Sequence, residues 1–281
     1  LEDNSTGQYN VAVGGSALTA NTTASNNTAL GYASLYDNTT GANNVAVGFL
    51  ALENNTTGTN TAVGKSALAG NTTGTANVAV GHVALDGNTT GNYNVAVGSN
   101  ALDGAGNANS NTALGYGTLR GTVTGSSNTA VGESALLSNT SGANNVAVGA
   151  GSLDANSTAS NNTAVGTSAL TTNTTGALNS ALGTYALSAN TTGANNVAMG
   201  YNALAANTTA TYNTGIGFRA GQAVTTGAQN TFIGGLSGDV NTTASNNTAL
   251  GYSSLGANTT GSNNVATGGY ALSNNTTASY N

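Results

Sequence analysis

The sequence predicts an all-β protein, a parallel β-solenoid with about sixteen coils of seventeen residues. A glycine recurs along the 281 residues with fourteen of fifteen intervals equal to seventeen, and the exception is Gly48 to Gly64, at sixteen. A period this strict is typical of stacked repeats, and seventeen residues are too few for a two-helix repeat. The segment before each glycine is rich in β-branched residues and bounded by Asn and Gly, which indicates a strand. We expect two or three short strands per coil.

Each coil is numbered here from its recurring glycine as position 0. Position −4 is Asn in all sixteen coils, position −3 is Val or Thr except at Ser180, and position −2 is nearly always Ala. Position −1 is an apolar residue except at Thr267. A glycine at position 0 permits a positive φ where the chain turns a corner. The recurring glycines are Gly14, Gly31, Gly48, Gly64, Gly81, Gly98, Gly115, Gly132, Gly149, Gly166, Gly183, Gly200, Gly217, Gly234, Gly251 and Gly268.

Stacking turns every repeated position into a column, so the Asn at position −4 predicts a ladder of amides. A second Asn at position +7, present in thirteen coils, usually opens an Asn-Thr-Thr segment and is interpreted as a ladder or turn residue. That segment is also an acceptor sequence for N-linked glycans, but a sugar on every coil would be too crowded. The ladder residues predicted at position −4 include Asn27, Asn44, Asn60, Asn77, Asn94, Asn111, Asn128, Asn145 and Asn162.

Leucine occupies position +4 in fourteen coils, which predicts an apolar column inside the solenoid. Burial of each Leu contributes about 1.5–3 kcal/mol, so this column is expected to dominate stability. The predicted core column includes Leu35, Leu52, Leu68, Leu85, Leu102, Leu119 and Leu136.

The strand itself has two uncharged faces. In Val45-Ala46-Val47, alternation sends Ala to one side and both Val to the other. Where Gly221 and Gly238 replace the Leu of position +4, Phe232 replaces a nearby Ala at position −2, as a shared core would require. This exchange favours a strand in which Ala points inward and Val points outward. The open alternative is that the larger side chains point inward. The outward face is either a plain neutral surface or a contact with another chain.

Composition excludes several classes of protein. Charged residues make up 4%, only three residues are Lys or Arg, and there is no Pro, Cys or Trp. Three cations are too few to form the basic surface that binds nucleic acid. No apolar run is long enough to insert this segment into a membrane. We interpret residues 1–281 as one continuous repeat array whose ends fall in mid-repeat.

Candidate chemistry is sparse. The charged residues occupy positions +1, +2, +5 and +6, which we expect to face water. His82 is the single histidine, and Asp86 and Asp103 fall at equivalent positions of adjacent coils, where a shared cation is the alternative to scattered surface charge. We therefore predict no catalytic residues, no cofactor, no metal site and no enzymatic activity.

Two kinds of exposed side chain remain as candidates for binding. The eleven Tyr cluster at variable positions such as +1 and +2, where they suit contact with carbohydrate or another surface, or are ordinary exposed residues. Regular Thr ranks resemble those of ice-binding proteins. Adjacent Thr residues in an extended segment point to opposite sides, so only one rank would be exposed.

Asn44-Val45-Ala46-Val47-Gly48, together with Asn-Thr-Ala-Leu-Gly in other coils, resembles the head repeats of trimeric autotransporter adhesins. Asn230-Thr231-Phe232-Ile233-Gly234 and the Asn-Thr-Thr-Gly spacers are similar to repeat arrays in bacterial and phage tail-fibre-like proteins. The resemblance implies a left-handed parallel β-roll, a homotrimeric head or stalk, and adhesion. The seventeen-residue period departs from the adhesin repeat, which is shorter.

The predicted function is therefore a structural or adhesive shaft or head of an extracellular fibre, located outside the cell or on a cell or virion surface. Exposed variable positions would contact a cell-surface or matrix ligand, and copies would associate as a homotrimer or filament. The alternatives are a self-assembling extracellular filament or matrix protein and an ice-binding solenoid.

Overall fold

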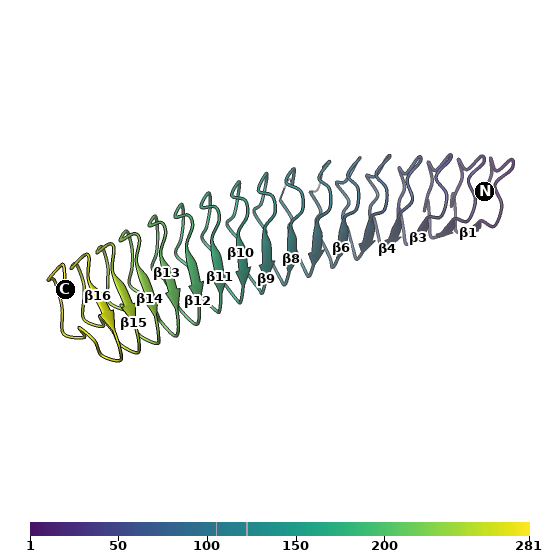
Figure 1. The fold of residues 1–281 in the computed structure, drawn as a ribbon. Helices are drawn as coiled ribbons and strands as arrows, with labels where there is room; N and C mark the ends of the chain where they lie inside the picture. Colours follow the sequence, from purple (N-terminus) through teal and green to yellow (C-terminus); the bar gives the residue numbers. More distant parts are fainter. Residues whose placement is uncertain (105, 122) are drawn as a thin grey trace. The chain divides into compact units, whose positions relative to one another are not determined.

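The computed structural model describes residues 1–104, 106–121 and 123–281. The chain divides into two compact units, Leu1–Ser141 and Gly142–Asn281. Each unit is a stack of coils with parallel strands in sequence order and no helix among its described residues (Figure 1). The predicted β-solenoid class is confirmed.

The described residues of the first unit form eight strands: β1 (Val11–Val13), β2 (Thr28–Leu30), β3 (Val45–Val47), β4 (Thr61–Val63), β5 (Val78–Val80), β6 (Val95–Val97), β7 (Thr112–Leu114) and β8 (Thr129–Val131). Eight belong to the second: β9 (Val146–Val148), β10 (Thr163–Val165), β11 (Ser180–Leu182), β12 (Val197–Met199), β13 (Thr214–Ile216), β14 (Thr231–Ile233), β15 (Thr248–Leu250) and β16 (Val265–Thr267).

In the described part of the chain, each coil contains one strand of three residues, so the expectation of two or three strands per coil was wrong. The rest of the coil bends too often to remain extended: in the coil of Gly48, Asn43, Leu50 and Leu52 have φ values of 59°, 56° and 52°. Neighbouring coils still bond outside the strands, as from Leu35 N to Ala51 O at 3.0 Å. The turns therefore replace strands without interrupting the coil-to-coil hydrogen bonds.

The recurring glycine is required by close stacking as well as by its φ. Gly48 has a φ of 140°, and a Cβ added there would lie 2.6 Å from the carbonyl carbon of Gly64 in the next coil. The short coil keeps this register, because Ala46 pairs with Ala62 across β3 and β4. The missing residue is taken up beside Thr59, which is exposed, as an exposed turn predicts.

The Leu column lies inside, with Leu35, Leu52 and Leu68 fully buried, and the Ala of position −2 faces it, with Ala46 and Ala62 also fully buried. A left-handed φ costs a residue with a Cβ about 1–2 kcal/mol. Burying a Leu side chain contributes about 1.5–3 kcal/mol, so the core offsets the strain of the turn. The other predicted column residues, Leu85, Leu102, Leu119 and Leu136, are buried in the same way.

The asparagine ladder of position −4 is present, with a geometry more specific than amide-to-amide contact. Asn44 donates its backbone N–H to Oδ1 of Asn27 at 2.9 Å, and Asn60 donates to Asn44 at 2.7 Å. The side-chain amide of Asn27 donates to Gly41 O at 2.9 Å. Each Asn thus bonds twice to the next coil, at the next Asn of the ladder and at the turn just before that Asn. The ladder runs from Asn10 to Asn128 in the first unit and from Asn145 to Asn281 in the second.

The Asn of position +7 forms a second buried ladder. Asn71 donates from Nδ2 to Asn55 Oδ1 at 2.8 Å and to Gly74 O, three residues on, at 3.0 Å. Asn55 makes the same pair of bonds with Asn38 and Gly58. These side chains are fully buried, so the predicted ladder and turn roles are combined in one amide.

Candidate functional site

The candidate site is the outward face of the strands in each unit, defined by the side chains at positions −3 and −1 and called here the outer face. In β12, Val197 and Met199 are 37% and 44% exposed, whereas Ala198 between them is buried. The same pattern holds in β11, where Leu182 is 46% exposed. The favoured interpretation of the sequence was that Ala points inward and the larger residues of the strand point outward, and the structure confirms it.

The outer face has no charged side chain, because positions −4 to 0 never carry one. Eight strands spaced about 4.8 Å apart and three residues wide make a strip of roughly 400 Å² in each unit. Soluble monomers rarely expose contiguous apolar patches larger than a few hundred Å². The strip, which includes Thr or Ser at position −3 of about half of the strands, is similar in size to the largest apolar patch of a typical monomer, about 300–600 Å², and such patches are often functional.

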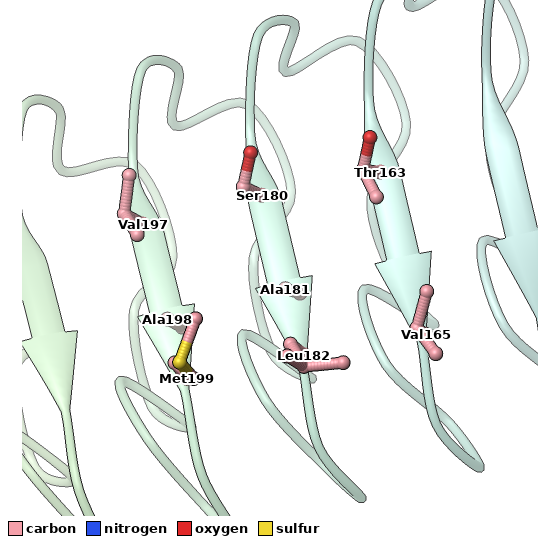
Figure 2. Close-up of a pocket in the computed structure, with 8 residues that line it drawn as sticks. All are labelled: Thr163, Val165, Ser180, Ala181, Leu182, Val197, Ala198 and Met199. Atoms are coloured by element: carbon pink, nitrogen blue, oxygen red, sulfur yellow. The ribbon is translucent and has the colours of Figure 1, made fainter.

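A hollow of about 340 Å³ lies on this face over β10, β11 and β12. Figure 2 shows its two rows of outward side chains, with Ser180 in the row of position −3 and Leu182 and Met199 in the row of position −1. Ser180 is the one residue at position −3 that is neither Val nor Thr. Because the Ser180 side chain is short and the neighbouring Leu182 and Met199 side chains are long, the surface is hollowed here without any charge.

The backbone behind the outer face is firmly held. The strands pair in register through both units, and the ladder of position −4 anchors the residue directly before each strand. A rigid surface loses little conformational entropy on binding. The arrangement is suited to contact with a rigid partner and offers no convergent acid, base or nucleophile.

The charged residues lie away from the outer face, but the expectation that they face water holds more fully at position +1 than at position +5. Lys65, His82 and Glu133 at position +1 are exposed, while acids at position +5, such as Asp86 and Asp103, are half-buried. Asp86 and Asp103 do sit close enough to interact: burial first, and then the negative charge of Asp103, raises the pKa of the Asp86 carboxyl. Asp103 also pairs with Arg120, with 3.9 Å between Oδ2 and Nε.

That acidic pair lacks the ligands of a metal centre. In the described part of the chain, no three His, Cys, Asp or Glu side chains gather to hold a metal ion. His82 stands exposed at its variable position. Nor does any helix among the described residues have the length and apolarity to cross a membrane.

Asn55 and Asn190, which open Asn-Thr-Thr segments of the second ladder, are fully buried and so are not accessible as glycan acceptors, whereas Asn275 is half-buried. The two Thr differ, as alternation predicts. Thr39 and Thr56 at position +8 are half-buried, and Thr56 donates its hydroxyl to Thr72 O at 2.9 Å, whereas Thr40 and Thr57 at position +9 are exposed. One exposed Thr rank is thus present in each unit.

Aromatic pairing between coils is a feature that the sequence analysis missed. Tyr32 and Phe49 stack with centroids 5.5 Å apart and planes 16° apart, and Tyr201 and Phe218 stack at 5.8 Å and 11°. All four residues occupy position +1, and the two members of each pair come from consecutive coils. That shared position is the signal that could have predicted the pairs.

Comparison of the chain with protein-family models, with curated proteins and with solved structures gave no match. The resemblance to adhesin heads and tail-fibre-like repeats therefore rests on the residues alone.

Proposed function

We propose that this chain is a structural segment of an extracellular fibre whose copies associate side by side through the outer face. The observation that carries the proposal is the strip of exposed, uncharged side chains that continues from strand to strand in each unit. Apolar burial drives such an association at about 25 cal/mol per Å². The resemblance to trimeric adhesin heads favours three copies.

The dimensions of the strip add a constraint on how the copies associate. A stable interface buries about 800 Å² on each partner, and the strip of one unit supplies about half of that. The association is therefore weak for a few coils and gains strength with every further coil that is engaged. A repeat array whose outward positions carry only uncharged residues, Val, Thr or Ser at −3 and Val, Leu, Ile, Met or Thr at −1, is suited to such additive binding.

The exposed variable positions at the corners supply the adhesive part of the proposal. Position +1 includes Lys65, His82 and Tyr116 in the first unit, and all three side chains are exposed. Because the outer face is uniform and these corners vary, copies associate through the uniform surface and the variable one contacts a cell surface or matrix.

Sedimentation equilibrium at micromolar concentration tests the proposal. The unmodified chain is expected to sediment as an oligomer, and Leu182→Lys, which puts a charge on the outer face, is expected to release monomers. The control is Thr175→Lys, in the exposed Thr rank of the same unit, which should leave the oligomer unchanged. A monomeric unmodified chain would refute the association.

The exposed Thr rank of position +9 favours one alternative, an ice-binding solenoid. Thr158, Thr175 and Thr192 are successive exposed members of this rank. Thermal hysteresis in solution that is lost in Thr175→Lys would favour this alternative over a fibre.

A further inference from the structure

The second unit carries a row of exposed aromatic rings along one corner. Tyr185, Tyr201 and Phe218 are 43%, 47% and 53% exposed. Tyr201 stacks on Phe218, and its ring lies edge-to-face with Tyr185 at 6.3 Å. Three rings from three consecutive coils are thus in contact and in water at the same time.

The row has a second group of rings beyond a glycine. Gly235 takes position +1 in the coil after Phe218, and Tyr252 follows it and meets Tyr270 edge-to-face at 5.5 Å. A Cβ added to Gly235 would lie 3.5 Å from Cδ2 of Tyr252. Because Gly235 has no side chain there, the Tyr252 ring is left uncovered on the side toward Phe218.

Polar groups border the rings without making the corner strongly charged. The guanidinium of Arg219 lies 6.0 Å from the centroid of the Phe218 ring, and its Nε donates to Oε1 of Gln222. Besides Arg219, residues 142–281 contain two charged residues, Asp154 and Asp239, both of them acids. Rings together with neutral hydrogen-bonding groups fit a ligand that is itself polar, uncharged and partly apolar.

We propose that this corner, defined by Tyr185, Tyr201, Phe218, Tyr252 and Tyr270 and called here the aromatic row, binds an extended neutral β-linked polysaccharide. Sugar rings present flat C–H faces that pack on aromatic rings, and their hydroxyls need donors and acceptors at the edges. Coils spaced about 4.8 Å apart match the advance of roughly one sugar ring along such a glycan. A chain lying parallel to the coil axis would then meet the exposed edges of the stacked Tyr201 and Phe218 rings and, beyond Gly235, the uncovered side of the Tyr252 ring.

This inference rests on the surface contact in the proposed function and names its ligand class. It uses a corner separate from the outer face, so the two can be tested independently. A globular ligand would need a concave site, whereas a row of rings over several coils fits a linear one. An acidic glycan is disfavoured because residues 142–281 carry two acids, Asp154 and Asp239, against one cation, Arg219.

The test is a calorimetric titration of the full chain with cellohexaose and chitohexaose, with a hyaluronan hexasaccharide as the acidic comparison. The chain has no Trp, so tyrosine fluorescence gives a second readout from the rings themselves. We expect at least one neutral hexasaccharide to bind and the acidic one to bind at least tenfold more weakly. Tyr201→Ala and Phe218→Ala should each weaken binding about tenfold, as truncation of an interface anchor does.

Two controls separate recognition from folding. Phe218→Tyr keeps a ring and should bind like the unmodified chain, and Tyr212→Ala removes a 61% exposed ring outside the row and should have no effect. Absence of binding by both neutral hexasaccharides, or equal loss of binding in Tyr212→Ala, overturns the inference. If the glycans do not bind while the chain still sediments as an oligomer, only the glycan-binding proposal is overturned. If the chain is a monomer that binds the glycan, only the proposed association through the outer face is overturned.

Discussion

Phe232 occupies the space that the Leu of position +4 fills in other coils, and it does so directly against Gly238. A Cβ added to Gly238 would lie 2.5 Å from Cδ1 of the Phe232 ring, and one added to Gly221 would lie 2.7 Å from Cδ2. Phe232 itself is fully buried. One large side chain on the strand thus replaces two Leu side chains on the turns, and core volume is conserved by exchange between coils.

This exchange predicts strong coupling between the three positions. Gly238→Leu alone should destabilise the chain by about 1–3 kcal/mol or more through overpacking, and Phe232→Ala alone by about 3–5 kcal/mol through a cavity. The triple variant Phe232→Ala, Gly221→Leu, Gly238→Leu restores the pattern of the other coils. Denaturation in guanidinium chloride should show it to be more stable than either single variant, whereas additive losses would contradict the shared core.

The second Asn ladder is interrupted where Val224 replaces Asn at position +7. Nδ2 of Asn241, in the next coil, is buried without a hydrogen-bond partner, and its Oδ1 accepts from Ala244 N at 3.2 Å. An unsatisfied buried donor costs about 1–3 kcal/mol. Val224→Asn should recover that amount by supplying the missing oxygen, measured as a higher denaturation midpoint. Val240→Asn, at a 38% exposed Val nearby, is the control and should change the midpoint little.

Removal of an amide from the ladder of position −4 should be costly. Asn162 Oδ1 accepts Asn179 N at 2.9 Å, and Asn162 Nδ2 donates to Gly176 O at 2.9 Å. Asn162→Ala leaves the Asn179 N–H buried and unpaired, for a loss of about 1–3 kcal/mol. Gly176 O keeps a bond from Asn173 Nδ2 at 2.9 Å. Thr175→Ala, which truncates an exposed side chain, should cost less than about 0.5 kcal/mol. Equal midpoints for the two variants would show that the ladder contributes nothing to stability.

The half-buried acids predict greater stability at mildly acidic pH. Burial raises the pKa of Asp86, Asp154 and Asp239 above the ordinary value of 3.8. A pKa raised on folding gives stability that is present below the unfolded pKa and is lost as pH rises through the folded pKa. The Tm should therefore fall as pH rises from about 4 toward neutrality.

Asp86→Asn isolates one of these carboxyl groups. Removal of one member of a like-charged pair on adjacent coils relieves roughly 0.2–1 kcal/mol, so this variant should have a raised Tm at pH 7 and an unchanged Tm at low pH. In Asp103→Asn, the pKa of Asp86 should still be raised, though by less than in the unmodified chain, since burial is the larger cause of the raised pKa. A Tm of Asp86→Asn that falls with pH as steeply as that of the unmodified chain would contradict this account.

The sequence was sufficient for the period, the strand position and the inward and outward faces, because stacking makes every repeated residue report on the same environment. The replacement of Ala by Phe232 beside two missing Leu side chains also indicated which face of the strand points into the core. The left-handed φ of Leu52 could not be predicted, since a bulky residue rarely adopts it; only the closed coil imposes it. The hollow beside Ser180 was also beyond reach, because it depends on the lengths of Leu182 and Met199 across two neighbouring coils.

Cross-linking through introduced cysteines tests the central claim, association through the outer face, most directly. The chain has no cysteine, so Leu182→Cys places a single thiol on the outer face and Thr175→Cys places one in the exposed Thr rank. Under mild oxidation at micromolar concentration, we expect Leu182→Cys to form disulfide-linked copies within the oligomer and Thr175→Cys to remain uncross-linked. Equal cross-linking of both variants, or none at Leu182→Cys while the chain sediments as an oligomer, would contradict an interface at this face.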